Sequence, residues 1–183
     1  YRAFYNCTDL ASVTIGKSVS IIKEAAFMDC SGLESITIPN SVTRIDNYAF
    51  SGCSSIKELI LEDGTSSLSL GYSPYSYTFE GWTTNQSCGL FYPCPIENVY
   101  IGRDISYERP PFYDTLTGGN PSIKSVTFGN CVTKICYNTF YKCSNLTSIT
   151  IGNSVSKIED DAFEGCPNLV SIYLEGTIPP IVG

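Results

Sequence analysis

The sequence predicts an α/β repeat solenoid: a right-handed coil of about seven rungs with one parallel β-sheet, short return strands and short helical turns. Three observations predict this fold. Phenylalanines recur at a spacing of 23 residues, at Phe4, Phe27 and Phe50 and again at Phe140 and Phe163. A cysteine follows each phenylalanine by three residues, and an aliphatic residue follows each cysteine by three. A short alternation of apolar and polar residues comes next, which indicates a strand buried on one face.

The aliphatic residues that lead the strands fix the number of rungs. Their positions are Leu10, Leu33, Ile56, Ile96, Ile123, Leu146 and Leu169. The intervals are 23, 23, 40, 27, 23 and 23 residues, so the seven rungs carry one insertion of 17 residues and one of 4. Because a unit of this length has too little apolar surface to fold alone, we expect neighbouring units to stack around one continuous core.

Each part of the unit has a predicted role. The alternation that ends at Ile36 and Ile38 predicts the sheet strand, and the Val-x-x-Ile step at Val42 and Ile45 predicts the return segment. The Ala-Phe-x-x-Cys stretch predicts a short helical turn. The position after each strand holds Gly or Glu and, once, Pro39. Because proline cannot take a positive φ, the glycines in this position are not expected to form left-handed turns.

We treat residues 1–183 as one repeat domain, a segment of a longer array, with irregular insertions near 62–90 and 106–120. The chain starts in the middle of a repeat, shows no signal peptide and has no apolar run of the roughly 20 residues that span a bilayer. No membrane span is therefore expected in this segment.

Composition excludes several functions. The net charge is −7, whereas a nucleic-acid binder normally carries a basic stripe, so no nucleic-acid partner is expected. The chain has no histidine, which excludes Ser-His and Cys-His nucleophile pairs and His-ligated metal sites. We expect no catalytic residues, no metal and no cofactor.

Six of the nine cysteines belong to the repeat. They could form a metal or redox ladder, but the chain has no Cys-x-x-Cys pair, and we favour buried cysteines that pack as small apolar side chains. Cys88, Cys131 and Cys136 lie outside this register. Cys131 and Cys136 would be roughly 16 Å apart in an extended segment, too far for a disulfide, whereas Cys88 and Cys94 could close a loop.

The outward positions of the strands are the natural ligand surface of a solenoid. Most hold Ser or Thr, which simply suit an exposed strand. The exceptions are Glu58, Ile60, Asn98, Tyr100 and Tyr173, and exposed aromatic residues with polar neighbours suit contacts with proteins or glycans. We predict these five as ligand-binding residues.

The longer insertion adds a second group of aromatic residues, which includes Tyr75 and Trp82, and the second insertion adds Tyr107 and Tyr113. They could form an aromatic platform for a sugar or peptide, or a small core that covers an irregular rung. Tyr75 and Trp82 are retained as candidate binding residues. The alternation from Leu68 to Tyr72 predicts an extra strand within this insertion.

The unit from Cys30 to Phe50, C-x-x-L-x-S-I-T-I-P-x-S-V-x-x-I-x-x-x-A-F, resembles the 23-residue leucine-rich repeat of the BspA-like family. The variant stretch from Gly89 to Tyr107 looks like repeats of such proteins in Bacteroides and relatives. The resemblance covers almost the whole chain. It implies a leucine-rich-repeat solenoid, a cell-surface or secreted location, and adhesion to host matrix proteins or other cells.

Three functions are compatible with these observations. The first is a non-enzymatic binding module for a protein or glycan ligand on host or neighbouring cells. The second is a structural spacer that presents another domain. The third is a carbohydrate-active enzyme with Glu58 and Glu97 as its carboxylate pair, but nothing in the sequence indicates the cleft that glycoside hydrolysis needs.

Overall fold

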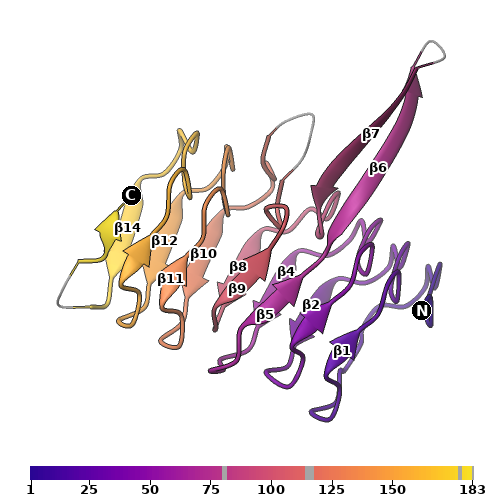
Figure 1. The fold of residues 1–183 in the computed structure, drawn as a ribbon, viewed down its shortest axis with the longest axis horizontal. Helices are drawn as coiled ribbons and strands as arrows, with labels where there is room; N and C mark the ends of the chain where they lie inside the picture. The colour runs from indigo at the N-terminus through magenta and orange to yellow at the C-terminus, as the bar shows by residue number, and fades with distance from the viewer. Residues whose placement is uncertain (80–81, 114–117, 177–178, 183) are drawn as a thin grey trace.

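A computed structural model describes residues 1–79, 82–113, 118–176 and 179–182 of the chain. Its main element is one parallel sheet (Figure 1). In spatial order the six strands are β14 (Ser171–Leu174), β12 (Ser148–Ile151), β10 (Ser125–Phe128), β8 (Asn98–Ile101), β4 (Glu58–Leu61) and β2 (Ser35–Ile38). The chain winds through them as a right-handed solenoid, which confirms the predicted coil and its parallel sheet.

The strands pair in the register of the repeat, so that equivalent residues lie side by side. Ile36 pairs with Leu59, and Leu59 pairs with Val99. All three are at most 3% exposed, whereas the residues that alternate with them along each strand face outward. The alternation in the sequence therefore sets which side of each strand is buried.

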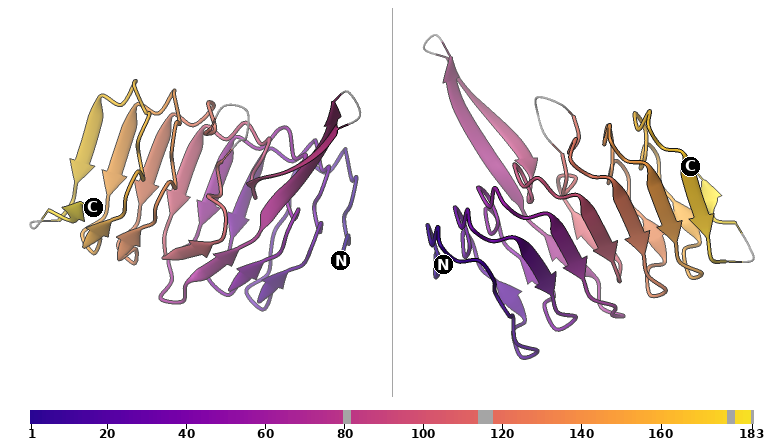
Figure 2. Two further views of the ribbon diagram at one scale, coloured as in Figure 1. Left: turned by 45° about the horizontal axis from the view of Figure 1, so that its top comes forward. Right: turned by 180° about the vertical axis from the view of Figure 1, so that it is seen from behind.

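The return segments form two smaller sheets on the other side of the core (Figure 2). One contains β1 (Ile21–Ile22), β3 (Arg44–Ile45), β5 (Leu68–Leu70) and β9 (Ile105–Tyr107); the other contains β11 (Lys134–Ile135), β13 (Lys157–Ile158) and β15 (Ile181–Val182). Side chains bridge the break between β9 and β11. The Asp104 carboxylate accepts hydrogen bonds from the Thr133 backbone N–H at 2.8 Å and from the Thr133 hydroxyl at 2.6 Å.

The prediction of short helical turns is wrong, because the described residues contain no helix. Each regular repeat has two positions with positive φ, one two residues before the phenylalanine and one just before the cysteine, as at Ala25 and Asp29. Such residues interrupt a helix, which needs negative φ throughout. Backbone N–H groups in this stretch donate to the neighbouring repeat along the coil axis instead. The Phe27 N–H, for example, donates to the Ala49 carbonyl of the next repeat at 2.9 Å.

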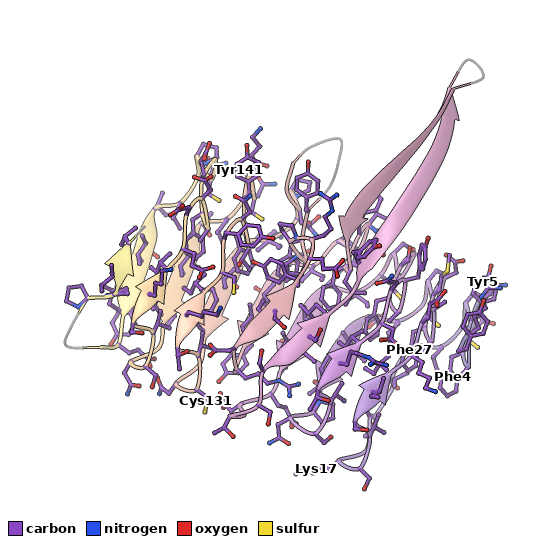
Figure 3. All side chains as sticks on the ribbon, in the orientation of Figure 1. Phe4, Tyr5, Lys17, Phe27, Cys131 and Tyr141 are labelled. Atoms are coloured by element: carbon purple, nitrogen blue, oxygen red, sulfur yellow. The ribbon has the colours of Figure 1, made fainter. Side chains whose placement is uncertain are left out.

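The phenylalanines form one stack through the coil. Ring centroids of consecutive members lie 5.0 to 5.8 Å apart, beginning with Phe4 and Phe27 (Figure 3). Phe112 fits between Phe91 and Phe140 although its sequence spacing is irregular. The stack therefore continues through both insertions.

The rung expected at residues 10–15 lacks its strand. Val13 and Ile15 still pack against the core, but the backbone bond from this segment to the next rung is long: Glu34 N–H, just before β2, donates to the Ala11 carbonyl at 3.4 Å. The sheet consequently has six strands rather than seven.

The longer insertion contains an antiparallel hairpin of β6 (Tyr72–Phe79) and β7 (Trp82–Gly89), which projects away from the coil (Figure 1). The predicted extra strand is confirmed as β5, although Tyr72 belongs to β6. At the base of the hairpin, Ser73 and Cys88 are buried. Among the residues that the structure describes, no helix could cross a membrane.

Candidate functional site

A shallow depression lies on the outer face of the main sheet, across β4, β8 and β10. It encloses about 310 Å³. Two rows of side chains line it: Glu58, Asn98 and Ser125 in one, and Ile60, Tyr100 and Thr127 in the other. Each row consists of register partners on adjacent strands. The structure thus brings together four of the residues predicted as ligand-binding.

Tyr100 is held in place by a carboxylate that the sequence did not indicate. Its hydroxyl donates a hydrogen bond to Asp63 Oδ1 at 2.8 Å. Asp63 lies in the turn after β4, at the repeat position that holds Asn40, Asn130 and Asn153 in other rungs. Burial raises the pKa of Tyr100 to about 12, and the hydrogen bond and negative charge of Asp63 add to this effect.

Gly129 provides the space for this contact. A Cβ atom at position 129 would lie 2.4 Å from the Tyr100 hydroxyl oxygen and 2.5 Å from Asp63 Oδ1. Gly129 does not have a positive φ, so the prediction that this glycine makes no left-handed turn is confirmed. Its absent side chain allows the close approach instead.

Polar bonds fix the rest of the surface. Ser125 Oγ donates to Asn98 Oδ1 at 2.6 Å, and Lys124 Nζ lies 2.7 Å from Glu97 Oε2 at the edge of the site. The bond from Lys124 and its positive charge lower the pKa of Glu97. A general acid needs a raised pKa, so this geometry does not suit Glu97 as the acid of a glycosidase pair with Glu58.

Arg103, which no feature of the sequence indicated, holds the turns at the ends of the strands beside Asp63. Its side chain is fully buried, with Nη1 donating to the Asn40 carbonyl at 2.8 Å and Nη2 to the Pro39 carbonyl at 2.9 Å. Arg103 follows β8 and Pro39 follows β2, so the guanidinium ties together turns two rungs apart. Burial lowers the pKa of Arg103.

The other predicted site residues lie elsewhere. Tyr173 is on β14, three strands from Tyr100. The two residues belong to one column, that is, they hold the same position on their strands, and they are about 14 Å apart at ordinary strand spacing. Tyr173 is 64% exposed. Tyr75 and Trp82 lie on the hairpin strands β6 and β7, and their side chains are outside the described part of the structure. The seven candidates therefore do not form one site.

The cysteines have a structural role. No disulfide joins Cys88 to Cys94, so the loop suggested by the sequence is not closed in this way. Cys30, Cys53, Cys94 and Cys143 of the repeat are buried, and burial raises the pKa of Cys53 and of Cys143 to about 12. Metal binding and redox chemistry need an accessible thiolate, which these positions disfavour.

Comparisons with known proteins agree with this architecture. The family model described as the BspA type Leucine rich repeat region matches residues 1–117 and 118–181, with six copies. A search of the curated proteins finds no match.

Two solved structures are similar to this chain. A leucine-rich repeat protein from Bacteroides ovatus is 25% identical with a TM-score of 0.54, and the match covers 93% of this chain and 44% of that one. A leucine rich cell surface protein from Faecalibacterium prausnitzii is 24% identical with a TM-score of 0.49, covering 79% of this chain and 32% of that one. The chain spans less than half of either protein. On the match of the family model, it belongs to the BspA-type leucine-rich repeat family.

Proposed function

We propose that the chain is a non-enzymatic binding module that acts at the cell surface or outside the cell. Its ligand is a protein or glycan on a host matrix or a neighbouring cell. The depression that joins Glu58, Ile60, Asn98 and Tyr100 is the observation that carries this proposal. The location and the adhesive role follow from the family resemblance.

The chemistry of the depression supports recognition of a polar ligand with some apolar surface. Tyr100 and Ile60 offer apolar contact, while Glu58 and Asn98 offer hydrogen-bonding oxygen and nitrogen atoms beside them. Because Asp63 already orients the Tyr100 hydroxyl, binding does not have to order that side chain. The surface is open, which suits a macromolecule better than a small enclosed substrate.

A binding screen tests the proposal. The chain is applied to immobilised extracellular-matrix proteins and glycans, together with Tyr100→Ala and Thr37→Ala variants. Thr37 is exposed in the same column, two strands from Tyr100, and lies outside the depression, so it is a matched control.

We expect at least one ligand whose affinity falls about tenfold or more in Tyr100→Ala, as for a central contact residue, and stays unchanged in Thr37→Ala. If the folded chain binds none of the panel, or if both variants bind like the original chain, the depression is not the ligand site. An empty panel would favour the alternative role of a spacer that presents another domain.

A further inference from the structure

A second depression lies at the opposite edge of the coil, among the turns that lead into the phenylalanine stack. It encloses about 360 Å³, and Tyr113, Tyr137 and Tyr141 line it. Tyr141 is at the edge from which the hairpin emerges, whereas Cys131, in the turn after β10, is at the other edge (Figure 3). No residue lines both this pocket and the depression around Tyr100, so the two are distinct.

Its tyrosines are held by neighbouring rungs. The Tyr107 hydroxyl donates to the Tyr137 carbonyl at 2.8 Å, and the two rings lie 5.7 Å apart between centroids. Tyr137 nevertheless keeps 44% of its surface exposed. The ring of Tyr141 already interacts with an ammonium group, because Lys142 Nζ lies 4.9 Å from its centroid. Such π faces attract cations.

The charges in the same wall are mainly negative. Glu108, Asp161 and Glu164 line the pocket, with Arg109 as the one cationic lining residue among those described. A hydrogen bond with the Asp161 carboxyl and repulsion from its negative charge raise the pKa of Glu164, while the positive charge of Lys142 lowers it. A cation placed between these carboxylates would relieve that repulsion.

We propose that this pocket accepts a lysine or arginine side chain from a partner polypeptide. Three tyrosine rings surround the apolar stem and the cationic head, and the carboxylates of Asp161 and Glu164 pair with the charge. The excess of negative charge in the wall disfavours an anionic ligand. The partner contact is additional to the proposed ligand site on the sheet.

A pair of small peptides tests the proposal on the complete chain. The probes are acetyl-Gly-Lys-Gly-amide and its uncharged analogue with norleucine in place of lysine, titrated at low salt and followed by chemical shifts of the tyrosine rings. We expect the lysine peptide to bind at least about tenfold more tightly than the norleucine peptide and to shift the rings of Tyr137 and Tyr141.

Variants locate the interaction. The double variant Asp161→Asn, Glu164→Gln preserves side-chain size, and asparagine tolerates the positive φ of 56° at position 161. We expect it to weaken binding of the lysine peptide about tenfold, while Glu34→Gln, an exposed carboxylate far from the pocket, leaves it unchanged. Tyr100→Ala should also leave it unchanged, which separates this result from that for the proposed function.

Three results would overturn the proposal: equal affinity for the two peptides, lysine binding that survives the double variant, or ring shifts caused by a neutral oligosaccharide such as chitotriose instead of the lysine peptide. The last of these would identify the pocket as a saccharide site. Circular dichroism of each variant shows whether it is folded.

Discussion

The Cys53 thiol donates a hydrogen bond to the Phe27 carbonyl oxygen at an Sγ–O distance of 3.1 Å. The same 26-residue step joins Cys30 to Phe4 and Cys166 to Phe140. This explains why the repeat keeps cysteine three residues after phenylalanine: the thiol fills a small buried space and satisfies a carbonyl of the preceding rung. The sequence indicated only that these cysteines pack as apolar side chains. That packing accounts for part of the preference for cysteine at this position, and the hydrogen bond accounts for the rest.

The reactivity of the cysteines follows from their burial. We predict that iodoacetamide modifies Cys7 and Cys131, which are exposed, in the native protein, while Cys53 and Cys143 react only after unfolding. Burial raises the pKa of both buried thiols to about 12, so almost no thiolate forms at pH 8. Mass spectrometry of timed samples measures this, and early modification of Cys53 would show that the rungs do not cover it.

The phenylalanine stack should dominate stability. Phe50 is fully buried between Phe27 and Phe91, with centroid distances of 5.5 and 5.7 Å. Changing Phe50 to Ala should lower the free energy of unfolding by about 3 to 5 kcal/mol, measured by urea denaturation. Phe163→Ala is the control and should cost less, because that ring is only partly buried. Equal losses would contradict the account.

Replacing Arg103 with lysine should destabilise the protein although the charge is kept. One ammonium group cannot reproduce the two guanidinium bonds to the Pro39 and Asn40 carbonyls, so we expect a loss of about 1 to 3 kcal/mol in urea unfolding. Arg44 forms an exposed ion pair with Asp46 at 2.7 Å, and Arg44→Lys should cost less than about 0.5 kcal/mol. If Arg103→Lys left the free energy of unfolding unchanged, the two guanidinium bonds would not be what holds these turns together.

The contact between Tyr100 and Asp63 predicts a difference in alkaline stability. The folded-state pKa of Tyr100 is about 12, above the ordinary value of 10.0, so folding favours its neutral form. Its contribution to stability is fully present below pH 10 and is lost as pH rises toward 12. Tyr100→Phe should therefore lose less melting temperature than the original chain between pH 9 and 11.5. Parallel losses in the two proteins would argue against the raised pKa.

The sequence predicted the parts of the fold that depend on periodicity. Alternation at Ile36 and Ile38 is local, so the strands, their buried side and their register could be predicted from it. The turn before each cysteine could not, because the left-handed conformations at Ala25 and Asp29 depend on bonds to the next rung.

The candidate site was predictable only where it follows the repeat. Glu58, Ile60, Asn98 and Tyr100 break the Ser and Thr columns and come together because strand order places β4 beside β8. Tyr173 breaks the same column, but β10 and β12 separate it from the others. Asp63 and Arg103 were missed because they lie in turns after the strands, where their contacts cross from one rung to others.

The Ile60 methyl group offers the most direct test of binding at the sheet depression. Ile60 is the isoleucine that lines it, so isoleucine-methyl NMR of the chain with the strongest ligand from the panel reports on this surface. We predict that the Ile60 δ1 methyl resonance shifts on binding while those of the buried Ile38 and Ile151 do not. An unchanged Ile60 resonance with a bound ligand would contradict the assignment of this depression as the ligand site.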